Sequence, residues 1–248
     1  MYSNYKKSIM WINGIMLLCL TFFSWFYARQ LLMYLTNQTK AGMCTADIII
    51  SNFSNWRNGY VSYVIIMIDI LFLVRNDFRY SNLIVYGSRR KLWNKQVLKI
   101  LTHAGIYTAY YGFCTLLFSL SYGFINVNWD DLDSYFFKIT TGLVSAEFST
   151  IIISFFLAFA FLWITIGLEY LLFHWLWNNE LFVWIMIFLV RFVVRKWLKV
   201  PIMINIGFLQ WMNHRIFLGF LITGILFILL YVTGFGYVRK REFLSERK

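Results

Sequence analysis

The sequence predicts an all-α protein, a polytopic membrane bundle in which six helices cross the bilayer. Three observations lead to this prediction: 60% of the 248 residues are hydrophobic, only 14% are charged, and the chain contains a single proline. Soluble globular chains are closer to about 45–50% apolar and about 25% charged. At about 20 residues for each helical span, the length suffices for roughly six spans with short connections. We therefore expect one transmembrane domain over residues 1–248 and no water-soluble domain.

The apolar blocks give the expected positions of the spans. They lie at residues 9–27, 59–74, 100–124, 148–173, 182–194 and 216–237. The first block continues into bulky residues without a small-residue cleavage site, so we expect it to be retained as a span. Every span is expected to be helical, because an unpaired backbone amide in hydrocarbon costs several kcal/mol. Runs such as IMIDILFLV also lack the alternation of a transmembrane β-strand.

The segments between these blocks are expected to be connections. Residues 30–58 form a polar connection, NVNWDDLDSYFFK (residues 126–138) a short acidic one, and residues 174–180 a tight turn. The segment 195–215, which contains the only proline, Pro201, is too polar to span the bilayer but apolar enough for two half-inserted helices. We expect these re-entrant pieces at the outer surface.

The basic residues indicate how the chain is oriented. With six spans, both ends share one side with the loop 75–99, and that side holds fourteen of the 23 Lys and Arg residues. Because basic residues gather on the cytoplasmic side, both termini and this loop are expected to be cytoplasmic. The net charge of +12 is then explained by membrane orientation and anionic headgroups, without nucleic acid. Arg191 and its basic neighbours fall on the outer side, for which snorkelling from a partly inserted helix is one explanation and a miscounted fifth span is the other.

Motifs for nucleotide, metal or thiol chemistry are absent from the sequence. It contains no GxxxxGK[ST] phosphate loop, no HExxH, no GxSxG and no CxxC. The histidines, His103, His174 and His214, are far apart in the chain, so we expect no metal site. Cys19 and Cys114 lie in apolar blocks and Cys44 in a connection, so all three are expected to be small buried hydrophobes.

Three ionisable residues inside the predicted spans are candidate substrate-pathway residues, because charges in a membrane are expensive and usually functional. They are Asp69 in the second span, Glu169 in the fourth and Arg191 in the fifth. A carboxylate there can pair with Arg191, bind protons or contact a cationic substrate. A purely structural hydrogen bond between helices, or a water-filled crevice near the interface, explains such a residue equally well.

The most basic segment is residues 75–99, with seven Lys or Arg residues and one acid, Asp77. Its hydrophobic residues recur at roughly helical spacing, and the run GSRRK interrupts the pattern. This is typical of a short amphipathic helix on the cytoplasmic surface, then a turn and a helix that rises into the third span. A plain headgroup anchor is the alternative, but the loop is long compared with the other cytoplasmic connections.

Two segments resemble a known family, the type-2 export permeases of ATP-binding-cassette transporters. The run YGSRRKLWNK (Tyr86 to Lys95) is similar to the family's block before the third span, and GFGYVRKREFL (Gly234 to Leu244) is similar to its last-span exit. The fifth short span and the pieces around Pro201 resemble the family's outer re-entrant helices. The layout is most similar to the small subunits of bacteriocin, lantibiotic-immunity and peptide exporters.

The resemblance implies a bacterial cell-membrane permease, not an enzyme, that moves an amphipathic peptide or lipid-like molecule out of the cell or bilayer. It implies a second copy or a sister permease, together with cytoplasmic ATP-binding subunits that hold the ATP and magnesium, so that this chain needs no cofactor. The residues implied to dock the ATPase are Arg79, Tyr80, Asn82, Leu83, Tyr86, Gly87, Ser88, Arg89, Arg90 and Lys91.

Two other classes of function remain open. An intramembrane enzyme would need polar groups that converge at one depth, and Asp69, Glu169 and His103 are the available set. A secondary transporter often has two similar halves with broken helices at matching positions, and no such repeat is visible here. A non-transporting scaffold belongs to the same group of alternatives.

Overall fold

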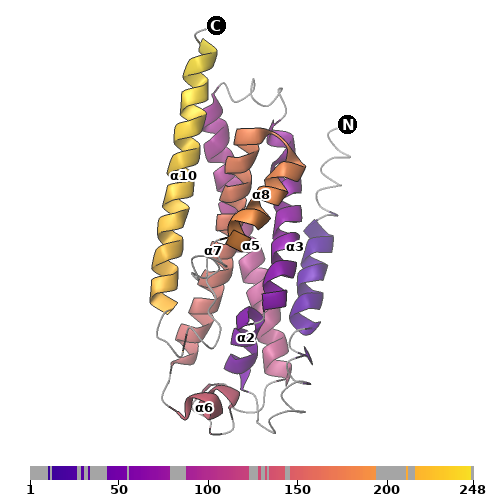
Figure 1. Ribbon diagram of the computed structural model, residues 1–248. Coiled ribbons are helices and arrows are strands. Elements are labelled where there is room, and N and C mark those ends of the chain that lie inside the picture. Colours follow the sequence, from indigo (N-terminus) through magenta and orange to yellow (C-terminus); the bar gives the residue numbers. More distant parts are fainter. Residues whose placement is uncertain are drawn as a thin grey trace.

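The computed structural model describes residues 11, 13–26, 29–30, 33, 44–54, 56–78, 88–122, 128–129, 132, 134–142, 146–193, 211 and 216–246. Nearly all of these residues are helical and no β-strand occurs among them, which confirms the all-α class. The long helices run side by side along a common axis (Figure 1). The predicted re-entrant pieces around Pro201 lie outside the described residues, as do residues 79–87.

The helices follow the predicted spans, with differences at their ends. In chain order they are a helix over Asn13–Phe26, α2 (Thr45–Ser54), α3 (Trp56–Val74), the 3-10 turn η1 (Arg75–Phe78), α5 (Arg89–Tyr122), α6 (Tyr135–Thr140), α7 (Phe148–Trp177), α8 (Glu180–Val193) and α10 (Ile216–Glu246). The turn expected at 174–180 is shorter, because α7 continues to Trp177 and the chain reverses at Asn178, whose φ is 50°.

Helix α2 lies inside the segment 30–58 that the sequence predicts to be a polar connection. Its three consecutive isoleucines, Ile48 to Ile50, are between 0% and 2% exposed. The backbone N–H of Cys44 donates to Asp47 Oδ2 over 3.2 Å, which ties the start of the helix. The prediction of a connection was wrong here, because the polar residues around this short apolar run outweigh it in composition.

Helix α5 begins eleven residues before the predicted span, at Arg89. Ser88 caps it, because its Oγ accepts the N–H of Lys91 over 3.2 Å. With 34 residues, α5 is about 51 Å long. The basic run and the apolar span are therefore one continuous helix that exceeds the roughly 30 Å hydrocarbon core of a bilayer.

Among the described residues, two helices are long and apolar enough to cross a membrane, by length and composition: α7 and the part Ile216–Lys240 of α10. Helix α7 is the centre of the fold, since 61% of its most apolar window is buried and it packs against α2, α3, α5, α8 and α10. In α10 only 6% of that window is buried. Its exposed large side chains are Phe217, Leu218, Leu221, Ile222, Ile225, Ile228, Leu229 and Val232.

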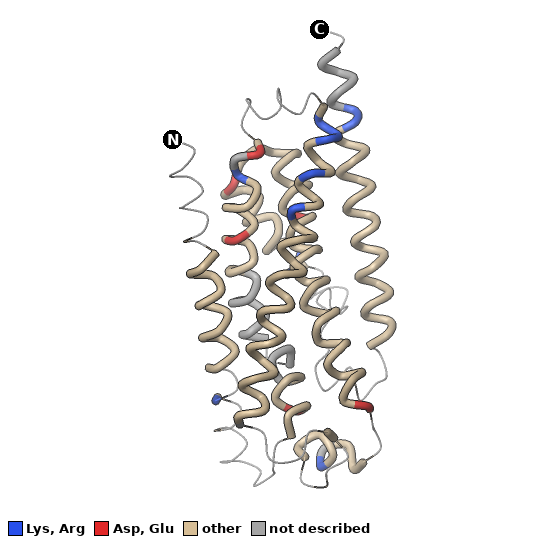
Figure 2. Tube along the Cα trace, turned by 180° about the vertical axis from the view of Figure 1, so that it is seen from behind, with Lys and Arg blue, Asp and Glu red and all other residues tan. Residues whose placement is uncertain are grey.

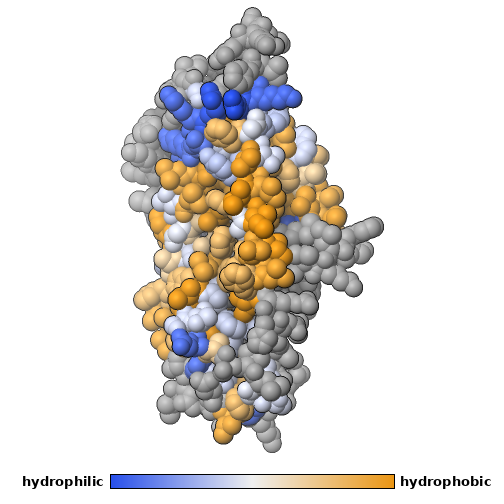
Figure 3. Space-filling view, turned by 90° about the vertical axis from the view of Figure 1, so that its left-hand side faces the viewer, coloured by the Kyte–Doolittle hydropathy of each residue, from blue (hydrophilic) through white to orange (hydrophobic). Residues whose placement is uncertain are grey.

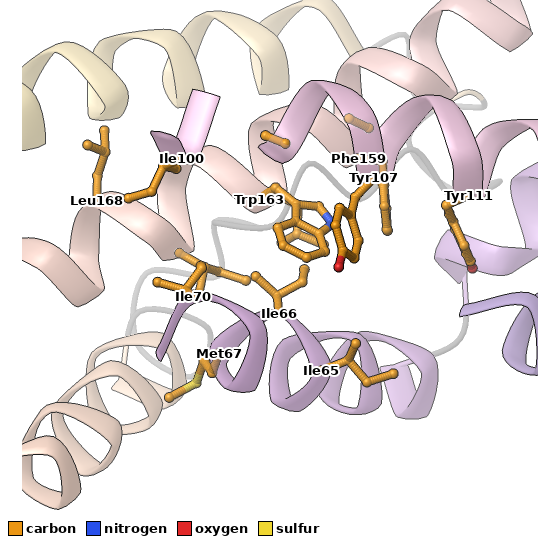
Figure 4. Close-up of a cluster of buried hydrophobic side chains, with 14 of the residues drawn as sticks. Ile65, Ile66, Met67, Ile70, Ile100, Tyr107, Tyr111, Phe159, Trp163 and Leu168 are labelled. Carbon is orange, nitrogen blue, oxygen red and sulfur yellow. The ribbon is translucent and has the colours of Figure 1, made fainter. Parts of the chain in front are cut away.

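The core forms where α3, α5 and α7 meet (Figure 4). The ring of Tyr107 lies 4.7 Å from that of Trp163, and the ring of Tyr111 stacks on Phe159 at 4.3 Å. Gly167 allows the close approach of α7 to α5, because a Cβ there would lie 2.5 Å from Cγ2 of Ile100. Aromatic rings from two helices therefore surround the apolar side chains of the third.

The polarity of the surface changes along the long axis of the helix bundle (Figure 3). In the space-filling view, hydrophobic side chains cover the middle of the visible face, and hydrophilic ones gather at the upper end (Figure 3). An apolar face of this size is unfavourable in water, whereas hydrocarbon accommodates it. This distribution agrees with the two candidate spanning helices and indicates a membrane location.

Candidate functional site

A buried ion pair joins α7 to α8. Arg191 Nε and a terminal nitrogen of its guanidinium lie 2.9 Å and 2.8 Å from Glu169 Oε2, and both side chains are less than a tenth exposed. Arg191 reaches α7 because it continues the buried stripe of α8 that contains Val183 and Ile187. The two candidate pathway residues thus neutralise each other, which is one of the alternatives that the sequence leaves open.

The third candidate, Asp69, lies on α3 and contacts α5. Its side chain is 1% exposed, and its Oδ1 accepts a hydrogen bond from the Tyr107 hydroxyl over 3.1 Å. His103 Nε2 is 3.5 Å from the other carboxylate oxygen, Oδ2. The structure therefore brings Asp69 together with His103, while Glu169 of the conceivable enzymatic set is paired with Arg191.

Polar contacts continue toward the end of the bundle where α5 begins. The Lys99 ammonium binds both oxygens of Asp77, at 2.7 Å and 2.6 Å, and so links α5 to η1. Trp175 Nε1 donates to Gln96 Oε1 over 3.0 Å, which links α7 to α5. These side chains fix the upper parts of the helices against one another.

The described part of the expected docking segment is its last four residues, Ser88 to Lys91. Ser88 and Arg89 are half-buried, and Arg90 and Lys91 are exposed on the first turn of α5. Arg79, Tyr80, Asn82, Leu83, Tyr86 and Gly87 lie outside the described residues. Most described Lys and Arg residues gather at this end of the bundle, where α5 begins and α10 ends (Figure 2).

The two segments that carry the family resemblance contact each other, although they are well over a hundred residues apart. Trp93 of α5 is fully buried, and its indole lies directly over Gly234 of α10, where a Cβ would clash with the ring. The Tyr231 hydroxyl donates to Asn94 Oδ1 over 3.1 Å. The start of α5 and the exit of α10 therefore form one junction, which sequence reasoning did not foresee.

Replacing Gly234 with valine is expected to displace the Trp93 ring and to lower the free energy of unfolding by about 1–3 kcal/mol, as overpacking does. Gly236→Val is the matched control, because nothing lies within 4 Å of a Cβ built there in the same helix. Thermal unfolding followed by tryptophan fluorescence in lipid nanodiscs measures both. Equal losses for the two variants would show that the Trp93 contact does not matter.

A second polar cluster lies at the opposite end of the bundle, around Asp47 of α2. Asp47 Oδ2 accepts the Ser134 hydroxyl over 3.1 Å and the Tyr135 N–H over 3.0 Å, and Oδ1 accepts the Phe136 N–H over 3.3 Å. Asp47 thereby caps α6 from 88 residues away. Sequence analysis missed Asp47, because no local pattern marks a carboxylate whose partners are so distant.

Cys44 lies beside this cluster, and its thiol donates weakly to Ser134 Oγ over 3.7 Å. Burial, reinforced by the charge of Asp47, raises the pKa of the Cys44 thiol to about 12. Because the thiolate is the nucleophile, Cys44 is unreactive at neutral pH. The expectation that Cys44 and Cys114 are buried is confirmed, whereas Cys19 is half-buried.

The geometry defines an all-helical protein with candidate membrane-spanning helices, buried polar contacts between them and a basic end. Within the described ranges, no group of three or more His, Cys, Asp and Glu side chains is placed to hold a metal ion. No protein-family model, curated protein or solved structure matches this chain.

Proposed function

We propose that this chain is the permease subunit of an ATP-driven exporter that moves an amphipathic peptide or a lipid-like substrate out of the cell or the bilayer. The observation that carries the proposal is the basic junction, in which the start of α5 packs on the exit of α10 through Trp93 and Gly234. Because α5 and α10 are continuous helices, a force applied at this junction would be transmitted along them into the membrane. A cytoplasmic ATP-binding subunit would act there.

Helix α5 has the length that such transmission needs. Its 34 residues exceed the roughly 20 that cross the hydrocarbon, so its first turns, with Arg89 to Lys91, project beyond the bilayer. Lys99 and Asp77 hold α5 to the end of α3 through η1. Tilting α5 would therefore also move α3, and the membrane helices would change between two arrangements without a chemical step in this chain.

The proposed topology has six crossings, with both termini and the basic end in the cytoplasm of a bacterial cell. The crossings are the helix Asn13–Phe26, α2 with α3, α5, α7, α8 and α10. Helix α8 has 14 residues and is about 21 Å long, so the fifth crossing needs residues beyond Val193. The basic end is assigned to the cytoplasm by the positive-inside rule.

The proposed partners are a second permease, identical or related, and ATP-binding subunits that carry the ATP and magnesium. Affinity purification in mild detergent tests this directly, by identification of the chains that co-purify. We expect a nucleotide-hydrolysing subunit among them. A preparation that transports substrate with no such companion would contradict the proposal and favour a secondary transporter.

The triple charge reversal R89E/R90E/K91E is expected to lower the recovery of the ATPase by about tenfold or more, because a loss of about 1.4 kcal/mol suffices for a factor of ten. Insertion into the membrane should be unchanged. The control R239E/K240E changes charge on α10 at the same end of the bundle. If both variants lose the ATPase equally, or neither loses it, residues 89–91 do not form the docking site.

A further inference from the structure

Asp69 and His103 face each other with two polar atoms that make no hydrogen bond. Asp69 Oδ2 and His103 Nε2 are 3.5 Å apart, and neither atom has a hydrogen-bond partner among the described residues. The other carboxylate oxygen is occupied by the Tyr107 hydroxyl. If Asp69 is ionised and Nε2 carries no hydrogen, two acceptors face each other, which is unfavourable in a buried site.

Other charged groups near this pair already have partners. The elements that pack against α3 carry other titratable or charged residues: Asp47 on α2, Arg75 and Asp77 on η1, Glu169, Tyr170 and His174 on α7, and Lys99 and Tyr107 on the part of α5 around His103. The rest of α5 carries Arg89, Arg90, Lys91 and Lys95, at least eight residues before His103, and Tyr110, Tyr111, Cys114 and Tyr122, at least seven residues after it. Glu169 binds Arg191, Asp77 binds Lys99, and Arg75 binds Glu180 of α8.

Three groups on α2 and α7 remain to be placed. Asp47 caps α6 at the far end of the bundle. Tyr170 and His174 lie further along α7, and the His174 ring stacks on Phe78 at 3.8 Å. Among the described residues, His103 is therefore the group with which the Asp69 charge can be balanced.

The neighbours of the pair hold its geometry but supply no charge. Tyr107 and His103 are one helical turn apart on α5, and their rings stack at 4.9 Å. The ring of Trp163 on α7 also packs against Tyr107, with ring centroids 4.7 Å apart. Ile65, Ile66 and Ile70 of the same helix as Asp69 are buried in the adjoining core (Figure 4). An isolated carboxylate in such surroundings is strongly unfavourable.

We propose that Asp69 and His103 form a proton-binding site between α3 and α5, which takes up one proton between Oδ2 and Nε2. The proton either makes a neutral carboxyl that donates to Nε2, or an imidazolium that donates to the carboxylate. In both forms the net charge of the pair changes from −1 to 0, and no other bond is made or broken. Tyr107 positions the carboxylate through Oδ1.

The two residues have different access to the proton. The Asp69 side chain is 1% exposed, whereas that of His103 is 16% exposed. His103 is therefore the side from which the proton enters. The bound proton makes a hydrogen bond between α3 and α5. It therefore strengthens the contact between these two helices, which Lys99 and Asp77 also link at the basic end. The site does not depend on a nucleotide-binding partner.

The test uses the chain alone, in phosphatidylcholine nanodiscs. Infrared difference spectra over a pH series detect the carbonyl band of a protonated carboxyl, and NMR of nitrogen-15-labelled histidine follows the imidazoles. We expect one histidine resonance and one aspartate band, either a carboxyl band that appears or a carboxylate band that shifts, to titrate with a common midpoint. In Asp69→Asn the band should disappear and the His103 resonance should lose that midpoint.

Two further variants separate a proton site from a structural hydrogen bond. Tyr107→Phe should move the frequency of the same aspartate band without removing it, because Oδ1 loses its donor. Asp77→Asn should leave both signals unchanged, since Asp77 is bound to Lys99. If the band survives in Asp69→Asn, or if His103 titrates identically with and without Asp69, the two residues do not share a proton. If Asp69→Asn fails to fold, His103→Gln decides, because an unaltered band and midpoint would then overturn the proposal.

Discussion

Replacing Arg191 with alanine is expected to lower the free energy of unfolding by about 3–5 kcal/mol, because the substitution leaves the Glu169 carboxylate buried without its partner. Nε and one terminal nitrogen of Arg191 lie within 2.9 Å of Glu169 Oε2, and Arg191 is the cation that neutralises this carboxylate. The loss is measured by thermal and denaturant unfolding in nanodiscs, with tryptophan fluorescence as the signal.

Arg75→Ala is the matched control for this prediction. Arg75 also forms an ion pair with α8, at 3.3 Å from Glu180, but its side chain is 60% exposed and that of Glu180 is 39% exposed. Exposed pairs contribute at most about 1 kcal/mol, so this variant should be close to the parent protein. If Arg75→Ala and Arg191→Ala destabilise equally, burial of the Glu169 pair has no special role.

A double variant separates the pair from its parts. Glu169→Gln with Arg191→Met removes both charges and keeps similar volumes, so it is expected to recover most of the stability that Arg191→Ala loses. If the transport activity that we propose for this chain also returns, the pair serves only to hold α8 against α7. If stability returns and transport does not, the charges themselves take part in the substrate pathway, as the sequence suggested.

The lengths of the apolar blocks were sufficient to predict α3, α7 and α10, because a helix with few charges and no proline continues as long as its surroundings remain apolar. The apolar block placed the start of the span at residue 100, whereas the break at GSRRK marked the start of the helix, and α5 does begin there, at Arg89. Lysine and arginine are good helix formers, so a basic run after a Ser cap extends a helix although it cannot extend a span. Hydropathy measures whether a segment can lie in hydrocarbon, not whether it forms a helix.

The sequence identified Asp69, Glu169 and Arg191 individually, because an ionisable residue within an apolar block is rare. The pairing of Glu169 with Arg191 also had a signal, since the two residues lie on opposite arms of a tight hairpin. No comparable signal joined Asp69 to Tyr107, which is 38 residues away. That contact depends on which faces of α3 and α5 pack together, and α5 has no marked apolar face.

Replacing Asp47 with alanine is expected to release α6 from α2 and to expose Cys44. The substitution leaves the Ser134 hydroxyl and the N–H groups of Tyr135 and Phe136 without their acceptor. Each buried donor left unpaired costs about 1–3 kcal/mol, so the closed arrangement should lose about 3 kcal/mol or more. Such a loss raises the open population roughly a hundredfold.

Maleimide labelling of Cys44 measures this opening, in a background with Cys19 and Cys114 replaced by alanine. In the parent, Cys44 is 1% exposed and its raised pKa keeps it protonated at neutral pH, so labelling requires local opening. Asp47→Ala should label roughly a hundredfold faster. Glu147→Ala removes an exposed carboxylate at the same end of the bundle, which accepts a hydrogen bond from the Ser149 hydroxyl, and it should label at the parental rate. Equal rates in the two variants would mean that Asp47 does not hold α6 in place.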